Sequence, residues 1–207
     1  MIEKRKYEQK LRAERQEETR RRITEATAAL HQEIGPAQTT ISAVAERAGV
    51  ERLTVYRHFP SERELIYACQ QHFRAQHPSP DPATWADIED PALRLTEALT
   101  AFYAYYSETE AMTANVLHDA PLMPTLREVL SGRAAYFSAT QEQLASGWDT
   151  PAELRELLLA AVGHALDFDT WRSLVRRQGL TNEQAVVLMV RLVRMLAANG
   201  AANGADG

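Results

Sequence analysis

The sequence predicts an all-α protein in two parts, with three short helices at the front and a helical bundle behind. Three observations support this fold class. Apolar residues recur at helical spacing along most of the 207 residues. No segment shows the apolar–polar alternation of a half-buried strand, and no internal repeat occurs. The stretch HPSPDP at 77–82 reads as a linker or loop, and the sequence after it is helical in pattern throughout.

Composition narrows the class of protein further. Apolar residues make up 45% of the chain and charged residues 25%, which is ordinary for a globular protein. The single cysteine, Cys69, excludes an internal disulfide framework and favours a reducing compartment. No apolar run approaches the roughly 20 residues that span a bilayer, and the N-terminus lacks the apolar core of a secretory signal. We therefore expect a cytoplasmic protein with no membrane partner.

Charge is unevenly distributed along the chain. Residues 1–63 hold 13 Lys and Arg against 10 Asp and Glu, whereas residues 64–207 hold 10 against 18. A basic front on an acidic body indicates that the front meets a polyanion. An excess of three charges could also arise by chance.

The front begins with a charged arm at 1–19 and continues into a helix. The run EKRKYEQKLRAERQEETRRR at 3–22 is typical of a solvated helix or a disordered arm, with Arg20–Arg22 at its inner end. Helical periodicity starts at Ile23 and Gly35-Pro36 ends it.

Two short helices follow. Thr40 is placed to cap a helix over 41–48, and Gly49 stands where a tight turn with positive φ is expected. The second helix runs over 52–58, with Val55 and Phe59 on its inner side. Its outer side carries Arg52, Thr54, Tyr56, Arg57 and His58. After Pro60, an S-x-x-E capping box at 61–64 starts the next helix, which continues towards Phe73.

The rear of the chain reads as helical throughout. We predict helices over 91–106, 111–118, 124–144, 151–178 and 182–198, the last begun by a T-x-x-Q capping box at 181–184. Gly179 is a natural C-terminal helix signal. The predicted divisions of the chain are a charged arm at 1–19, a domain of short helices at 20–66, a larger helical domain at 67–198, and a flexible tail at 199–207.

Two short helices joined by a glycine turn form the helix-turn-helix arrangement, whose second helix lies in the DNA major groove. Any amphipathic surface helix also has polar outer residues, so a pair of short helices does not by itself indicate DNA binding. The spacing is more specific. The stretch Thr39-Thr40-Ile41…Val44-Ala45…Ala48-Gly49-Val50…Thr54-Val55-Tyr56…His58-Phe59 closely resembles the DNA-binding segment of the TetR family of bacterial repressors. The matched segment covers about 20–66, and the rest agrees in architecture only.

This resemblance implies a homodimer on a near-palindromic DNA operator, repressing transcription until a small ligand binds the C-terminal domain. Activation instead of repression stays open. The residues that it assigns to DNA binding are phosphate contacts at Thr40, Ser42 and Tyr56, groove contacts at Arg52, Leu53, Thr54 and Arg57, and a backbone contact near His58.

Three positions depart from the family's pattern. Glu51 replaces the usual Ser or Thr cap of the recognition helix. Leu53 replaces a common small residue and could touch a thymine methyl group. Glu62 stands where the family usually has a phosphate-binding lysine, and Arg63 beside it could take over that contact.

Aromatic residues gather in the rear domain, where they predict either ordinary core or a ligand pocket between helices. The candidate pocket residues are Phe102, Tyr106, Met112, Val116, Tyr136, Phe168 and Trp171, with His118, His164 and Asp167 as polar groups. They suit a small lipophilic or aromatic effector. Asp167 and Glu110 could favour a cationic one, or could simply face water.

The last helix is apolar nearly all round, which marks a buried element. Together with the helix before it, it could pair with a second subunit as a four-helix bundle. The alternative is a monomer core that hides both faces. The candidate interface residues are Leu157, Leu158, Ala161, Val186, Met189, Val190 and Val193.

The other function classes find little support in the sequence. The six histidines form no H-x-x-x-H pair, and neither a nucleotide-binding motif nor a catalytic one occurs. We therefore expect no metal, no cofactor and no enzymatic activity. A helix-bundle enzyme and a protein-interaction module without DNA binding remain the alternative classes, and a steep salt dependence would distinguish DNA binding from the latter.

Overall fold

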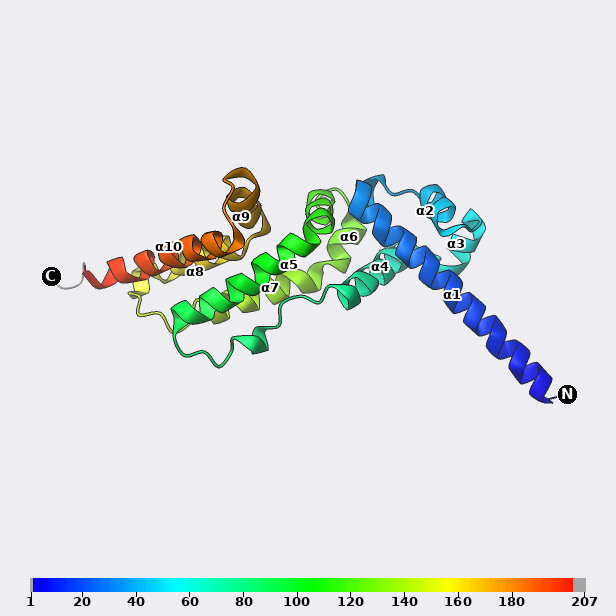
Figure 1. The fold of residues 1–207 in the computed structure, drawn as a ribbon, viewed down its shortest axis with the longest axis horizontal. Helices are drawn as coiled ribbons and strands as arrows, with labels where there is room; N and C mark the ends of the chain where they lie inside the picture. Colours follow the sequence, from blue (N-terminus) through cyan, green and yellow to red (C-terminus); the bar gives the residue numbers. More distant parts are fainter. Residues whose placement is uncertain (1, 203–207) are drawn as a thin grey trace. The chain divides into compact units, whose positions relative to one another are not determined.

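The computed structural model describes residues 2–202, in which helices joined by turns and loops occur and no strand is present (Figure 1). The chain divides into two compact units. The first unit comprises Met1–Pro78 and Ala111–Ser131, and the second comprises Ser79–Glu110 and Gly132–Gly207. No helix within 2–202 is both long enough and apolar enough to cross a membrane.

The first unit is built on a long helix, α1 (Ile2–Ile34), which packs against α2 and α4. Its other helices are α2 (Ile41–Ala48), α3 (Arg52–His58), α4 (Glu62–Gln76), α6 (Pro124–Val129) and the last part of α5 (Pro91–Asp119). Helix α3 packs on α2, and α4 packs on α6. The order α1–α4 thus confirms the predicted front helices.

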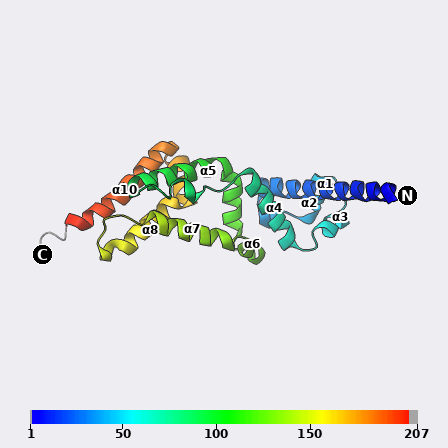
Figure 2. The same cartoon turned by 90° about the horizontal axis from the view of Figure 1, so that it is seen from below.

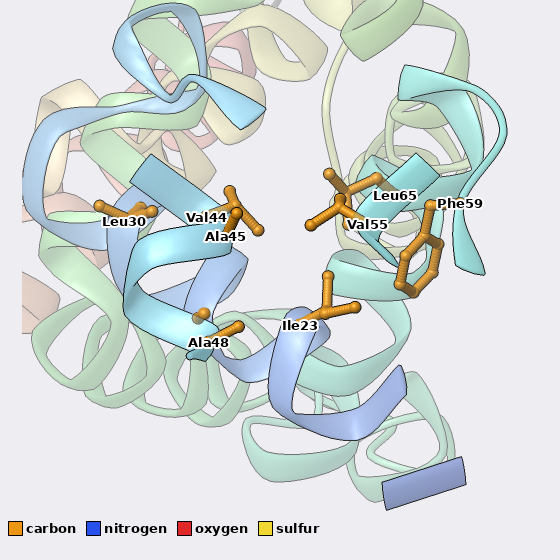
Figure 3. Close-up of a cluster of buried hydrophobic side chains, with 9 residues drawn as sticks. Ile23, Leu30, Val44, Ala45, Ala48, Val55, Phe59 and Leu65 are labelled. Carbon is orange, nitrogen blue, oxygen red and sulfur yellow. The ribbon is translucent and has the colours of Figure 1, made fainter. Parts of the chain in front are cut away.

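The apolar positions predicted for these helices form one core (Figure 3). Ile23, Val44 and Val55 are fully buried, and Phe59 is 2% exposed. Figure 3 shows these side chains directed towards one another from α1, α2 and α3, joined by the side chain of Leu65 from α4. Each such burial contributes roughly 1.5–3 kcal/mol relative to an exposed side chain. This core fixes α3 on the rest of the unit.

The local signals at the helix ends act as the sequence predicts. The Thr40 hydroxyl accepts a hydrogen bond from the Ala43 N–H at 3.1 Å, so Thr40 caps α2. The Ser61 hydroxyl accepts from the Glu64 N–H at 3.2 Å and caps α4. Each cap satisfies a backbone donor that has no partner within its helix.

The second unit contains the first part of α5 with α7 (Ser131–Leu144), α8 (Arg155–Leu166), α9 (Phe168–Arg172), a π-helical turn at Ser173–Arg177 and α10 (Asn182–Ala202). Helix α8 packs against α9 and α10. The predicted capping box forms at the start of α10: the Gln184 N–H donates to the Thr181 hydroxyl at 3.2 Å, and the Thr181 N–H donates to Oε1 of Gln184 at 3.0 Å.

The two helices predicted over 91–106 and 111–118 are a single helix, α5. The intervening residues include no Pro or Gly. Instead, the Ser107 hydroxyl donates to the Tyr103 carbonyl at 3.0 Å and the Thr109 hydroxyl to the Tyr105 carbonyl at 2.7 Å. These side chains bond back to their own helix, so they do not interrupt it.

Two helices predicted as continuous are broken. The segment 124–144 divides at Leu130 into α6 and α7. The segment 151–178 divides at Asp167, whose backbone is extended with φ −72° and ψ 138°. The Asp167 carboxylate accepts from the Asp169 N–H at 2.7 Å and therefore begins a new helix, α9.

The predicted boundaries differ from the structure at both ends. Helix α1 begins at Ile2, so the charged arm at 1–19 is helical from that residue. Helix α10 reaches Ala202 instead of ending near Ala198, and the rest of the predicted tail, 203–207, lies outside the described residues. The compact units also cut the chain differently from the predicted domains, because the first unit extends to Pro78 and includes 111–131.

Candidate nucleic-acid interface

Helix α3 has two unlike faces. Its inner face carries Val55, which is fully buried. Its outer face carries Arg52 and Arg57, both exposed, together with Leu53 and Tyr56, which are 79% and 47% exposed. Large apolar side chains that remain exposed beside cations are typical of a surface that contacts a partner. A helix of this length fits a major groove roughly 12 Å wide.

The turn between α2 and α3 is held by backbone and side-chain hydrogen bonds. Gly49 has φ +63°, and its N–H donates to the Glu46 carbonyl at 3.1 Å. The Val50 N–H donates to the Ala45 carbonyl at 2.9 Å, which completes a left-handed helix end. The Arg22 guanidinium of α1 donates to the carbonyls of Ala48 and Gly49. The turn therefore fixes the angle at which α3 leaves α2.

Arg20 holds the other end of α3. Its guanidinium donates to the His58 carbonyl at 2.6 Å and lies over the Phe59 ring, 4.1 Å from the centroid. The cluster Arg20–Arg22 is visible in the sequence, but no structural role was predicted for it. Its position could have indicated such a role, because the cluster directly precedes Ile23, the first fully buried residue of α1.

The supporting helix α2 presents its N-terminus to solvent. Thr40 and Ser42, predicted to meet phosphate, are both exposed there. The Thr40 oxygen already accepts the Ala43 N–H, which leaves the hydroxyl proton for an external acceptor. At the other end of α2, Arg47 makes a two-point ion pair with Glu33 at 2.6 and 2.7 Å. Hydrogen bonds and an ion pair within the chain thus hold both ends of α2 in place in the absence of DNA.

His58, predicted to lie near the DNA backbone, is half-buried at the end of α3. Burial lowers the pKa of its imidazole, and the charges of Arg57 and Arg20 lower it further. The side chain is therefore neutral at pH 7, where it can offer a hydrogen bond but no charge.

Arg63, the candidate replacement for the phosphate contact that Glu62 cannot make, is engaged within the chain. The Arg63 guanidinium pairs with the Glu128 carboxylate of α6 at 2.8 Å. A phosphate contact by Arg63 would have to compete with this exposed pair. Glu62 is exposed, and the Glu51 side chain makes no capping hydrogen bond to α3.

The structure separates the predicted pocket residues between the two units. Met112 and Val116 lie in the first unit, where they pack with Ala28 and Cys69. His118 is also in the first unit, and its imidazole bonds to Asp119 at 2.8 Å. The remaining seven predicted residues belong to the second unit.

Five of those seven form a cluster of rings. Tyr106 is its centre, 6.0 Å from Phe102, 5.4 Å from Phe168 and 5.8 Å from Trp171 between ring centroids. Tyr136 contacts Phe102 at 6.2 Å. All except Tyr136 are at most 3% exposed, so the cluster is core packing. Burial raises the pKa of Tyr136 to about 12.

The polar groups predicted to orient an effector already have partners within the chain. Asp167 caps α9, and His164 contacts the Thr170 hydroxyl at 3.1 Å. Glu110 pairs with Arg176 at 2.8 Å and with Arg172 at 3.7 Å. Both carboxylates that could have favoured a cationic effector, Asp167 and Glu110, are therefore already engaged within the chain.

The candidate interface residues of α10 point inward. Val186, Met189, Val190 and Val193 are at most 8% exposed within the single chain, as is Leu158 of α8. Ala161 is half-buried, and Leu157 is 54% exposed. Among the described side chains of α10, four large apolar ones face solvent: Val187, Leu188, Leu192 and Met195. None of the four is among the predicted interface residues.

Cys69 is buried beside His31 of α1, with its sulfur 3.5 Å from Nδ1. Burial raises the pKa of this thiol to about 12, so it stays protonated and unreactive at neutral pH. Within the described residues, no group of three or more His, Cys, Asp or Glu side chains is placed to hold a metal ion.

Comparison with known proteins agrees with this geometry. Residues 23–69 match the family model described as bacterial regulatory proteins, tetR family. The matched range contains the glycine turn, α3 and the capped start of α4. No match was found among curated proteins.

Solved structures extend the similarity in fold to most of the chain. A TetR-like transcriptional regulator from Rhodococcus sp. RHA1 is 20% identical, covers 89% of this chain and 96% of its own, and gives a TM-score of 0.63. A TetR-family regulator from Streptomyces coelicolor is 20% identical, covers 90% and 83%, and gives 0.60. One from Mesorhizobium loti is 16% identical, covers 89% and 97%, and gives 0.60. The chain therefore has the fold of these regulators.

Proposed function

We propose that this chain, a member of the TetR family by its helix-turn-helix segment and its fold, is a transcriptional repressor that responds to a small ligand. It binds a near-palindromic operator as a homodimer and releases the DNA when an effector binds the second unit. Two-fold symmetry places two copies of α3 in successive major grooves, about 34–36 Å apart or a multiple of this distance.

The outer face of α3 carries this proposal. Arg57 is exposed near the end of the helix, and a guanidinium can bond to both O6 and N7 of a guanine. Leu53 is the most exposed large apolar side chain of the motif and suits a thymine methyl group. The Tyr56 hydroxyl suits a phosphate oxygen, which positions the helix without reading sequence.

The ring cluster around Tyr106 supports an apolar effector. An aromatic or lipophilic molecule could replace ring–ring contacts with equivalent ones, whereas a polar metabolite would leave its hydrogen bonds unpaired. The cluster is packed in this structure, so binding requires rings such as Tyr136, the only partly exposed member, to rotate. A neutral effector is favoured over a cation, because Asp167 and Glu110 are engaged within the chain.

Release of DNA requires that the effector bind more tightly to the conformer in which the two α3 helices are wrongly spaced. A hundredfold preference supplies about 2.7 kcal/mol per site. An effector with equal affinity for both conformers would leave operator binding unchanged.

The test begins with selection of bound duplexes from a random DNA pool by the full-length protein. We expect a near-palindromic sequence, and we expect Arg57→Ala to weaken binding by about 1–3 kcal/mol and to relax preference at one base pair of each half-site. Tyr56→Phe should weaken all sequences alike. Arg74→Ala, which removes an exposed arginine from the last turn of α4, serves as the control.

Three results would count against the proposal. If the selection recovers no preferred duplex, the proposal of sequence-specific DNA binding is contradicted. Unchanged affinity and unchanged base preference for Arg57→Ala would remove the assigned role of α3. For the effector, lipophilic compounds that raise the melting temperature yet never alter DNA affinity would contradict the switch.

A further inference from the structure

The first part of α1, Arg5–Thr19, extends beyond the packed helices of the first unit; we call it the N-terminal extension. Its side chains are exposed from Arg5 to Glu18, apart from the half-buried Leu11. Figures 1 and 2 both show α1 continuing past α3 towards its free end. At 1.5 Å per residue, the extension is about 22 Å long, which corresponds to roughly six base-pair steps of DNA.

The two sides of the extension carry different charges. Arg12, Arg15, Thr19 and Ile23 follow one another at intervals of three or four residues. Arg5 lies seven residues, or about two helical turns, before Arg12. Helical periodicity therefore places the three arginines on the side of α1 that carries Ile23. We call this side the arginine face; it also carries Glu8.

The opposite side is acidic, and two of its cations, Lys10 and Arg21, pair with glutamates. Lys10 pairs with Glu14 at 3.8 Å. Arg21 pairs with Glu18 at 2.8 Å and with Glu25 at 2.9 Å. By contrast, no ion pair joins Arg12 or Arg15 to any residue in the described part of the chain. Both guanidinium groups can therefore meet a phosphate without breaking an existing pair.

The arginine face is directed to the same side as the helix-turn-helix. Ile23 packs in the core shared by α1, α2 and α3. Arg20 and Arg22 flank that position, and they contact the end of α3 and the α2–α3 turn respectively. When α3 lies in a major groove, this face is thus on the side of α1 that carries the helix entering the groove.

We propose that the N-terminal extension lies along the phosphate backbone next to each half-site, with Arg12 and Arg15 contacting phosphates. The partner is double-stranded DNA, recognised by charge and not by base sequence. The extension thereby lengthens the bound site beyond the base pairs that α3 contacts and strengthens binding at every sequence. This inference rests on the proposed DNA-binding function and assigns a second, sequence-independent contact to it.

The experiment compares two double variants of the full-length protein. Arg12→Gln/Arg15→Gln removes two charges from the arginine face, and the control Lys10→Gln/Arg21→Gln removes two from the opposite side. Binding is titrated against the duplex recovered from the random pool, either trimmed at the outer edges of its half-sites or extended by about one helical turn on each side. Circular dichroism verifies that both variants remain helical.

The expected results are specific to one variant and one duplex. On the extended duplex, the slope of log affinity against log salt should be less steep by about 0.9 for each phosphate that an arginine no longer neutralises, hence by about 3.6 for the two arginines of both protomers. The affinity at 0.1 M salt should fall by at least an order of magnitude. On the trimmed duplex, the wild type and the variant should differ much less.

Each contrary result has its own meaning. A wild type that selects no duplex overturns the proposed function itself. A wild type that binds, together with an Arg12→Gln/Arg15→Gln variant that keeps the same affinity and salt slope on the extended duplex, overturns only the role of the extension. Equal losses for both double variants would indicate an effect of net charge, which also overturns it.

Discussion

The Arg20 guanidinium donates a hydrogen bond of 2.6 Å to the main-chain carbonyl of His58, across 38 residues of sequence. The last carbonyls of a helix have no partner inside the helix, so this bond satisfies one of them at the end of α3. The same guanidinium covers the Phe59 ring. A single side chain of α1 thus fixes both the end of α3 and the residue that anchors it in the core.

We expect Arg20→Ala to lower the free energy of unfolding by roughly 1–3 kcal/mol, because the substitution removes a charge-assisted hydrogen bond and a cation–π interaction together. DNA affinity should fall as well, although Arg20 need not touch DNA. Urea denaturation and gel-shift titration measure the two effects. The control Arg74→Ala should leave stability within about 0.5 kcal/mol. A stable Arg20→Ala protein with full affinity would show that Arg20 does not hold α3.

Gly49→Ala tests the turn. Alanine at φ +63° costs about 1–2 kcal/mol, and its Cβ would lie 2.8 Å from the Arg22 guanidinium that bonds to the turn. We expect a loss of stability of this size together with weaker DNA binding. Gly132→Ala is the control, because Gly132 is helical with open space at its Cβ position; it should stabilise the protein by up to about 1 kcal/mol. Equal melting temperatures for Gly49→Ala and the wild type would contradict the strained turn.

The helix ends and the front core could be predicted because their signals are local. A helix cap such as Thr40 or Ser61 depends only on the four residues that follow it in sequence. Within each front helix, the spacing of apolar residues such as Ile23 and Val55 indicates which side chains face inward. The breaks in the rear helices are less visible in the sequence. Asp167 resembles any surface carboxylate until its oxygen is seen to accept from the start of α9.

The outer face of α3 could be predicted from the sequence, because α3 has polar residues on one side only; their contacts with DNA stay a prediction. Helix α10 is apolar on both sides, so periodicity alone could not distinguish its inner face from its outer one. Val190 and Leu192 are equally apolar, yet they are 8% and 50% exposed. The predicted pocket residues divide between the two units for another reason. Helix α5 is a single helix that contributes to both units, so residues close in sequence, such as Tyr106 and Met112, pack in different cores.

The homodimer leads to a prediction about α10. Its exposed apolar face, Val187, Leu188, Leu192 and Met195, together with Leu157 of α8, is the surface that we expect to pair with a second copy. Leu192→Glu should place a charge in that interface and give a monomeric mass by light scattering, with a loss of operator binding. Leu93→Glu, equally exposed at 50% but on α5, should remain dimeric. Val190→Glu would instead unfold the chain, because Val190 lies in its own core. A dimeric Leu192→Glu protein would place the interface elsewhere.

His31 gives a prediction about pH. The imidazole is 5% exposed, and burial lowers its pKa from 6.5 to about 4, against the opposing charge of Asp119. Its Nδ1 lies 3.5 Å from the Cys69 sulfur, whose thiol stays neutral. The folded protein therefore keeps this histidine uncharged at a pH where the unfolded chain already binds a proton.

The sign follows from this difference in proton binding. Above pH 6.5 neither state is protonated at His31, and its contribution to stability is complete. As the pH falls from 6.5 to about 4, the unfolded state alone gains the proton, so the free energy of unfolding falls by as much as about 3 kcal/mol. His31→Leu, which has nothing to titrate, should lack this part of the decline. Urea denaturation of both proteins at pH 7, 5.5 and about 4.5 measures it, because the other acid-sensitive groups cancel in the difference. Parallel pH profiles for the two proteins would mean that His31 is protonated in the folded state as readily as in the unfolded one.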